Sequence, residues 1–156
     1  MVCHVNLATM THEIYIASDH AGHGLRTKLA GFLREEGHII HDLGPETPER
    51  VDYPDFGHKL ALAMKSVSDA RGVLVCGSGI GISIAANRSP WIRAALCHDV
   101  TSARLSREHN DANVIVFGER LIGEEVARQA LAMFLETDFE GGRHTARVEK
   151  LGRTSS

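Results

Sequence analysis

The chain alternates short, largely apolar runs with longer stretches in which apolar residues recur every three or four positions. Apolar runs of this kind indicate buried strands, whereas the longer spacing indicates helices with one buried face. The runs predict strands at Glu13–Ser18, Ile39–Ile40, Val73–Cys76, Trp91–Cys97 and Asn113–Phe117. The helical spacing predicts helices at Gly22–Glu36, Pro54–Val67, Ile82–Arg88, Val100–Glu108, Glu124–Leu135 and Arg143–Leu151.

The inward faces and ends of these helices can also be predicted. Gly37 stands where glycine often ends a helix, and Pro54 suits the first turn of the next one. We expect the buried side chains of three helices to be Leu25, Leu29, Phe32 and Leu33; Phe56, Leu60, Met64 and Val67; and Val126, Ala130, Leu131 and Phe134.

Strands that alternate with helices predict an α/β fold. We expect a three-layer α/β/α sandwich, in which helices cover both faces of a five-stranded parallel, Rossmann-like sheet through right-handed crossovers, with a C-terminal helical tail. Residues 12–153 would form a single domain, and residues 1–11 would be a poorly ordered polar extension.

Composition narrows the class of protein. The chain has 156 residues, of which 43% are hydrophobic and 24% charged, as in ordinary globular domains. A net charge of −3 argues against a general nucleic-acid binder, and no apolar run is long enough to span a membrane. The start lacks a secretory signal, and the three cysteines are too few and odd in number for a disulfide framework. We therefore expect a cytoplasmic protein with free thiols.

One edge of the predicted sheet gathers most of the candidate chemistry. The carboxyl ends of parallel strands converge, and ligands bind there in open α/β sheets. This places Asp19, His20, Cys76–Gly81, His98, Asp99 and Gly118–Arg120 together. The turn with Gly77, Gly79 and Gly81 can direct backbone N–H groups at an oxyanion or a phosphate.

The cysteines have two possible roles. Cys76 is either a small buried apolar residue or a reactive thiol beside an anion cradle, and Ser78 is either a turn residue or a hydroxyl donor. Cys97 closes an apolar strand without a glycine turn and is expected in the core. Cys3 is expected to be exposed and incidental.

The glycine turn also invites comparison with the dinucleotide-binding fingerprint. Its third glycine comes one position early, and Ile82 stands in the fingerprint's place. Asp99 lies at about the right separation for a ribose-binding acid. However, the turn follows the third strand rather than the first. We disfavour a dinucleotide site on these grounds.

Further candidates lie near the end of the helix after the fourth strand, on the last helix and after the first strand. His109 is either a helix-end residue that favours the C-terminal dipole or a proton carrier. Arg143 and Arg147 share a helix face, where two guanidiniums would clamp a phosphate; the alternative is a merely basic, solvated tail. His20 and His23 have metal-ligand spacing but no partner at a known spacing, so we expect no metal.

Five motifs together resemble one enzyme family. They are Asp19-His-Ala-Gly22, Asp52-Tyr-Pro54, Cys76-Gly-Ser-Gly-Ile-Gly-Ile-Ser-Ile-Ala-Ala-Asn87, Ser106-Arg-Glu-His-Asn-Asp111 and Gly141-Gly-Arg-His-Thr-Ala-Arg147. In this order, over nearly the whole chain from Glu13 to Leu151, they are similar to the type B ribose-5-phosphate isomerases. That family also includes galactose-6-phosphate and allose-6-phosphate isomerases.

The resemblance implies an aldose–ketose isomerisation through a cis-enediolate. Cys76 would be the base, His109 the ring-opening group, and Ser78 would keep the hydroxyl of the family's usual threonine. The remaining implied site residues are Asp19, His20, Tyr53, the N–H groups of Gly77, Gly79 and Gly81, Asn110, and the phosphate ligands Arg120, Arg143, His144 and Arg147.

The predicted function is therefore interconversion of ribose 5-phosphate and ribulose 5-phosphate, without metal or organic cofactor. The predicted partners are a phosphorylated sugar and a second copy in a homodimer or tetramer with shared sites, but neither nucleic acid nor membrane. The alternatives are a six-carbon substrate (allose or galactose 6-phosphate), a cysteine hydrolase that uses Cys76 and His109, and a non-catalytic sugar-phosphate or nucleotide binding module.

Overall fold

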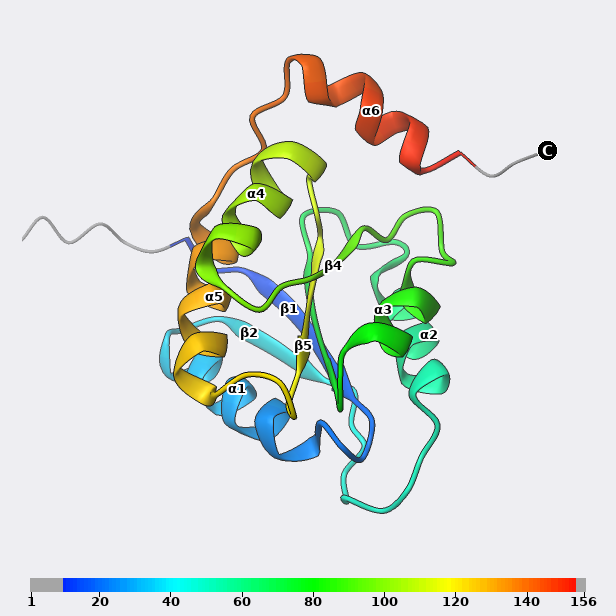
Figure 1. Ribbon diagram of the computed structural model, residues 1–156, viewed down its shortest axis with the longest axis vertical. Coiled ribbons are helices and arrows are strands. Elements are labelled where there is room, and N and C mark those ends of the chain that lie inside the picture. The colour runs from blue at the N-terminus through cyan, green and yellow to red at the C-terminus, as the bar shows by residue number, and fades with distance from the viewer. Residues whose placement is uncertain (1–9, 154–156) are drawn as a thin grey trace, which may run out of the picture.

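The protein is built around one five-stranded parallel sheet, as the sequence predicts. A computed structural model describes residues 10–153 (Figure 1). The strands are β1 (Glu13–Ser18), β2 (Ile39–Asp42), β3 (Arg71–Cys76), β4 (Ala94–Leu96) and β5 (Val114–Gly118), in the spatial order β2-β1-β3-β5-β4. All of the pairings are parallel, so the carboxyl ends of the strands lie at one edge.

Helices cover both faces of the sheet. The helices are α1 (His23–Glu35), α2 (Tyr53–Met64), α3 (Ile80–Ala86), α4 (Val100–Asn110), α5 (Glu124–Glu136) and α6 (Arg143–Leu151). One buried cluster joins α1, α4 and α5 to the sheet, and a second joins α2 and α3 to its other face. The three-layer α/β/α prediction is therefore confirmed. Helix α6 lies outside these layers, against α4 (Figure 1).

Strand alternation explains why the core has two halves. Val73 and Val75 of β3 point into the cluster with α1, α4 and α5, while Leu74 and Cys76 point into the cluster with α2 and α3. Successive side chains of a strand leave opposite faces, and both faces are covered here. Cys76 thus emerges at the end of β3, on the side of α2 and α3.

Some predicted boundaries and one buried position were wrong. Val126 is 38% exposed, because the inward stripe of α5 runs through Ala127, Ala130, Leu131 and Phe134 instead. The strand predicted at Trp91–Cys97 pairs with β5 only over Ala94–Leu96, since a turn bond from the Ile92 N–H to the Ser89 carbonyl precedes it.

Three helix ends also shift. Helix α3 begins at Ile80 rather than Ile82, α2 ends at Met64 rather than Val67, and α4 continues through His109 to Asn110. The predicted extension 1–11 and Cys3 lie outside the described residues, apart from Met10 and Thr11, and stay predictions. No helix within residues 10–153 has the length and apolar character needed to cross a membrane.

Candidate functional site

A pocket of about 320 Å³ opens at the carboxyl edge of the sheet. Strand register explains its composition, because Ser18 pairs with Val75 and Cys76 pairs with Gly118, so that the loops after β1, β3 and β5 meet. Tyr53, from the start of α2, closes one side. The lining residues are Asp19, His20, Ala21, Tyr53, Cys76, Gly77, Ser78, Gly81, Arg120 and Leu121.

The turn after β3 is organised around the sulfur of Cys76. Cys76 is only 4% exposed, yet it lines the pocket, and the backbone N–H of Gly79 donates to its Sγ at 3.0 Å. Gly79 has a φ of 78°, which lets the chain reverse into α3 with its N–H directed back at the sulfur. Cys76 is therefore held by the glycine turn as well as by the core, at the surface of the pocket.

The same turn limits which N–H groups remain for a ligand. The N–H of Gly79 is used by Cys76, and the N–H of Ile80 donates to Oγ of Ser78 at 3.3 Å. The cradle predicted from Gly77 to Gly81 is therefore narrower than expected. Within the described residues, the N–H groups of Gly77, Ser78 and Gly81 donate no backbone hydrogen bond and so remain as donors. Gly81 stands in the first turn of α3, where N–H groups have no partner inside the helix.

Two of the glycines lie directly against neighbouring side chains, and at Gly81 there is no space for a Cβ. A Cβ on Gly81 would stand 2.6 Å from the ring of Tyr53, and a Cβ on Gly77 would stand 3.4 Å from the guanidinium of Arg120. The N–H of Arg120 also donates to the carbonyl of Gly77 at 3.0 Å. Tyr53 and Arg120 therefore pack directly on the turn, and Arg120 brings a positive charge to the pocket.

Asp19 and His20 are held in place by the backbone. Oδ1 of Asp19 accepts the N–H of Gly22 at 3.0 Å, which shapes the turn into α1. Nδ1 of His20 accepts the N–H of Val51 at 3.2 Å, so the 43–52 loop is fixed against the pocket. Gly22 lets the turn into α1 pack closely against the end of β3, because a Cβ at this position would stand 2.4 Å from the carbonyl oxygen of Val75.

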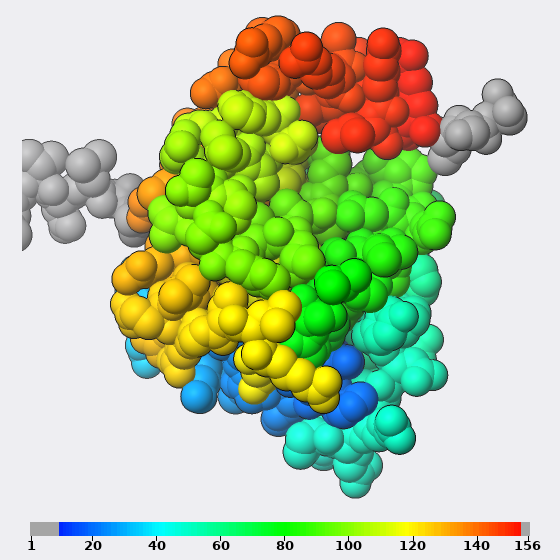
Figure 2. All heavy atoms as spheres, in the orientation of Figure 1, coloured from blue at the N-terminus to red at the C-terminus, as the bar shows by residue number. Residues whose placement is uncertain are grey.

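The other predicted site residues gather at the opposite end of the protein. Helix α4 has eleven residues, so it carries His109 and Asn110 about 16 Å away from the carboxyl edge. Helix α6, with Arg143, His144 and Arg147, packs on that end of α4. Figure 2 shows α6 in red as a ridge at one end, while the blue loop after β1 lies towards the other.

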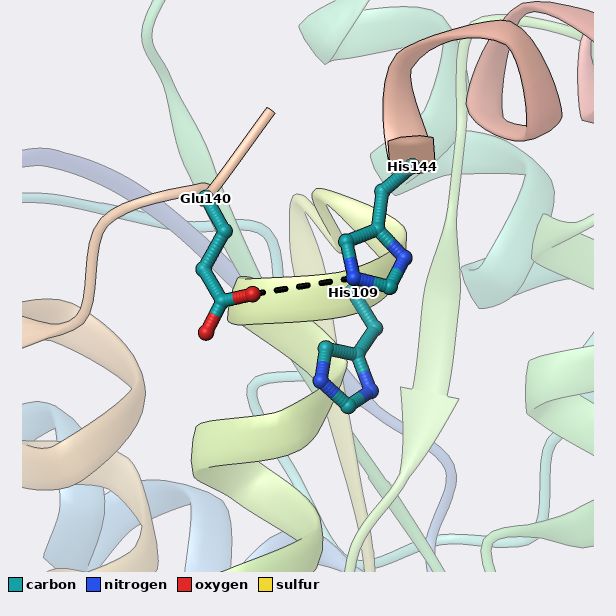
Figure 3. A group of neighbouring side chains, drawn as sticks. All are labelled: His109, Glu140 and His144. Carbon is teal, nitrogen blue, oxygen red and sulfur yellow. Dashed lines mark ion pairs between the residues drawn. The ribbon is translucent and has the colours of Figure 1, made fainter. Parts of the chain in front are cut away.

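His109 and His144 stack on each other. Their ring centroids are 4.5 Å apart with planes 15° from parallel, and Nε2 of His144 lies 3.6 Å from Oε2 of Glu140 (Figure 3). Burial lowers the pKa of His144, and the charges of His109 and Arg143 lower it further. Arg143 and Arg147 are exposed on α6, four residues apart.

This cluster does not converge on a metal ion. The nearest donor atoms of His109, Glu140 and His144 lie within 4.8 Å of one another. A metal ion lies in the plane of the imidazole ring that binds it, however. The rings of His109 and His144 are stacked and nearly parallel, so no single ion can lie in both ring planes. His20 and His23 instead contact the backbone of Val51 and Glu46. The expected absence of a metal stays a prediction.

The structure therefore divides the predicted residues into two groups. Gly79 completes the turn beneath the carboxyl-edge pocket. The predicted residues that line this pocket are Asp19, His20, Tyr53, Cys76, Gly77, Ser78, Gly81 and Arg120. His109, Asn110, Arg143, His144 and Arg147 stand apart from it. A Cys76–His109 nucleophile and base pair does not form within one chain. Asp99 caps α4, where its Oδ1 accepts the N–H of Ser102 at 2.6 Å. Because this carboxylate serves as a helix cap, the structure also disfavours it as a ribose-binding acid.

Sequence reasoning missed three residues that shape these groups. Leu121 lines the Cys76 pocket, Val51 holds His20, and Glu140 faces His144. Leu121 follows Arg120 at the carboxyl edge, so its position in the chain was a usable signal. Nothing in the local pattern marks Val51, because its partner His20 is 31 residues away. Glu140 stands only four residues before His144, so that spacing was a usable signal.

Comparison with known proteins gives consistent matches over nearly the whole chain, including both groups of candidate residues. The family model described as Ribose/Galactose Isomerase matches residues 14–151. Ribose-5-phosphate isomerase B of Escherichia coli is 42% identical over 139 residues, which cover 89% of this chain and 93% of the relative. D-erythrulose-4-phosphate isomerase of Pectobacterium atrosepticum is 41% identical over 141 residues, which cover 90% and 93% of the two chains.

Solved structures agree in both fold and sequence. Ribose-5-phosphate isomerase B of Clostridium thermocellum superposes with a TM-score of 0.88 at 49% identity, covering 90% of this chain and 95% of the other. The corresponding protein of Thermotoga maritima gives a TM-score of 0.89 at 45% identity, with 92% and 99% covered. These likenesses extend through both groups of candidate residues.

Proposed function

Because the chain belongs to the ribose/galactose isomerase family, and is thus a sugar-phosphate isomerase, we propose that it interconverts ribose 5-phosphate and ribulose 5-phosphate with Cys76 as the base. The observation that supports this most directly is the hydrogen bond from the Gly79 N–H to the sulfur of Cys76 inside the carboxyl-edge pocket. The family assignment sets aside the hydrolase and the non-catalytic binding module.

The reaction moves one proton between neighbouring carbons. The thiolate of Cys76 takes the proton from C2 of the open-chain aldose, and the electron pair of that C–H bond forms the C1–C2 double bond of the enediolate as the C1 carbonyl becomes an oxyanion. The thiol then returns a proton to C1, while O1 gains a proton and the C2 hydroxyl loses one to become the ketose carbonyl. In this proposal the N–H groups of Gly77, Ser78 and Gly81, with the Ser78 hydroxyl, stabilise the negative charge on the enediolate oxygens. Asp19 and Tyr53 would contact the sugar.

The base assignment is tested by replacing the thiol. Cys76→Ala and Cys76→Ser should each reduce kcat by about 10²-fold to 10⁴-fold, which is the usual contribution of a positioned base. Cys97→Ala is the matched control, because Cys97 is also a buried strand-end cysteine, but burial raises its pKa and it lies outside the pocket. Turnover near wild type in both Cys76 variants would rule out this base.

We also propose that two copies of the chain share each site. The C-terminal end of α4 and helix α6 lie at the opposite end of the molecule from the carboxyl edge of the sheet (Figure 1). They carry His109, which would open the sugar ring, and Arg143 and Arg147, which would anchor the phosphate. A second copy related by a two-fold axis can bring them to the pocket. Exposed apolar side chains beside the pocket supply a surface for it: Ile80 (53% exposed), Ile84 (52%) and Leu121 (57%).

A complementation experiment tests the shared site. Cys76→Ala and His109→Asn chains are each expected to be inactive, but mixing them after unfolding and refolding should restore about one quarter of wild-type activity. Half of the random dimers are mixed, and each mixed dimer has one site with both groups intact. If the mixture stays as inactive as its components, the two residues act within one chain or not at all.

The phosphate anchor and the substrate need separate measurements. Arg143→Ala should raise KM for ribose 5-phosphate by about tenfold or more, since charge-assisted bonds to phosphate are strong, while an unchanged KM would place the anchor elsewhere. Its neighbour His144 would assist, and Asn110 would contact substrate. The relatives are named for different sugars, so a panel of phosphorylated aldoses distinguishes five-carbon from six-carbon specificity.

A further inference from the structure

A second polar pocket, of about 590 Å³, opens at the amino edge of the sheet. It lies between the 65–70 loop after α2, the start of β3, the segment before β4 and the end of α4. None of the residues that line the Cys76 pocket takes part in it. We call it the amino-edge pocket, and its charged and aromatic side chains are those of Lys65, Asp69, Arg71, Trp91, Arg93, Arg107 and Asp111.

Positive charge is concentrated in the amino-edge pocket. One lysine and three arginines line it against two aspartates, although the whole chain carries a net charge of −3. Charges of one sign inside a concave surface attract an oppositely charged small molecule. The pocket therefore has an excess of two positive charges that the rest of the molecule does not share.

Two of the arginines share a single carboxylate. Arg93 and Arg107 each donate to Asp111, at 3.4 Å to Oδ2 and 2.9 Å to Oδ1 respectively. Arg107 is only 3% exposed and also binds the carbonyl oxygens of Ala112 and Thr137. These two guanidiniums are largely occupied by structural contacts, and Asp111 has little capacity for a third.

Arg71 is the cation without an adequate partner. One terminal nitrogen of Arg71 reaches the carbonyl oxygens of Asp69 and Ala70, both at 3.3 Å, and its buried Nε has no hydrogen-bond partner among the described residues. Burial lowers the pKa of Arg71, the positive charges of Arg107 and Arg93 lower it further, and the negative charges of Asp111 and Asp69 raise it in part, although neither carboxylate forms an ion pair with Arg71 within the described residues. A buried N–H of a charged group is costly to leave unpaired.

We infer that the amino-edge pocket binds an oxyanion of the phosphate class through Arg71 and Lys65. A guanidinium presents its N–H groups as a planar fork that matches two phosphate oxygens, and an ammonium adds a point charge. The bound anion would accept from the terminal N–H groups of Arg71 and from the ammonium of Lys65, and it would neutralise the two excess positive charges. This site is separate from the anchor proposed on α6 and does not depend on the isomerase proposal.

Trp91 makes the site measurable. It is the only tryptophan in the chain, it lines the amino-edge pocket, and the ammonium of Lys65 lies 5.0 Å from its ring centroid. An anion that draws Lys65 away from the ring changes the surroundings of this single fluorophore. Titration of pyrophosphate, followed by Trp91 emission and by calorimetry at constant ionic strength, reports binding at this pocket.

The titration is made on an Arg143→Gln/Arg147→Gln protein, which removes the anchor proposed for the substrate phosphate. We expect one pyrophosphate per chain to bind, with an emission change. Arg71→Gln and Lys65→Gln should each weaken binding about tenfold, Arg71→Lys should recover part of it, and Arg34→Gln should have no effect, because Arg34 is exposed outside the pocket.

Three results would overturn the inference. They are no binding by calorimetry in the protein without the α6 anchor, an unchanged affinity in Arg71→Gln, and an equal loss of affinity in Arg34→Gln. The measurement reads binding rather than turnover. Failure of the isomerase proposal would therefore leave it intact, and its own failure would leave the isomerase proposal intact.

Discussion

Gly81→Ala tests how closely the glycine turn and Tyr53 share the space beside Cys76. The added Cβ would stand 2.6 Å from two ring carbons of Tyr53 and 3.0 Å from its hydroxyl oxygen. Ordinary contacts of a Cβ are at least 3.4 Å, so a gap of about 0.8 Å must be opened. Tyr53 is 43% exposed and begins a helix, so its ring can move where the backbone cannot.

The expected effect on stability is small. Rotating the tyrosine ring off its preferred angle costs about 0.5–1.5 kcal/mol. Alanine is better than glycine in a helix by about 0.8–1.0 kcal/mol, less at the first turn. The two contributions nearly cancel, so the free energy of unfolding should stay within about 1 kcal/mol of wild type. Activity should suffer more, because a displacement of about 1 Å in an active site can cost up to 10²-fold.

The assay is a double-mutant cycle. Gly81→Ala, Tyr53→Ala and the double variant are compared by urea unfolding and by kcat/KM with ribose 5-phosphate. We expect kcat/KM to fall about tenfold or more in Gly81→Ala and to fall little further when Tyr53 is also removed. Gly31→Ala is the control, since no atom lies within 4 Å of a Cβ there and the substitution should stabilise α1 by about 0.5–1 kcal/mol.

Two results would refute this reasoning. A loss of stability above about 3 kcal/mol that Tyr53→Ala does not relieve would mean that the backbone of the turn moves, rather than the ring. Unchanged kcat/KM in all three variants would mean that Tyr53 does not contribute to the site. The first result would refute the argument that the ring moves, and the second would remove Tyr53 from the proposed contacts with substrate.

Further predictions concern the supports of the site and the response to pH. Arg26→Met should lower the free energy of unfolding by about 2 kcal/mol, because buried Arg26 binds Asp42 and the carbonyl of Pro45, whereas exposed Arg34→Met should not; equal urea midpoints would contradict this. Burial lowers the pKa of His38 below its ordinary value of 6.5. As the pH falls through 6.5, the unfolded chain therefore binds more protons than the folded chain, and the free energy of unfolding decreases. His38→Asn should flatten that decline in urea unfolding between pH 7.5 and 5, and an unaltered slope would exclude His38 as its cause. Ser78→Ala should lower kcat more than it raises KM if the hydroxyl acts on the enediolate, which steady-state kinetics with Ser78→Thr as the conservative control can decide.

Much of the fold could be predicted because the local pattern and the tertiary structure agree. The apolar run at Glu13–Ser18 and the helix at Arg143–Leu151 were predicted with their observed bounds, the second although the periodicity of the chain weakens after Asp138. Val126 failed because the exact face of α5 depends on which neighbours it meets. The predicted strand from Trp91 was too long because its pairing is set by the short ladder to β5.

The candidate site was predicted as residue types, and only partly as a place. Cys76 and its glycines could be recognised because a strand end, a thiol and a tight turn are neighbours in the chain. The shared use of the turn's N–H groups could not be recognised, since the bond from Gly79 to the sulfur depends on a φ of 78°. The unpaired Nε of Arg71 could not be predicted either, because its surroundings come from four separate segments.

The sequence by itself determined the alternation of strands and helices, the parallel sheet and the family to which the five motifs belong. These properties depend on periodicity and on short-range spacing, which the chain carries directly. The sequence also placed Cys76 and Arg120 at one edge of the sheet. Only the tertiary structure decided that His109 and Arg143 lie at the other end. That division follows from the direction in which α4 returns across the sheet, and it is why a single chain holds two separate halves of the proposed chemistry.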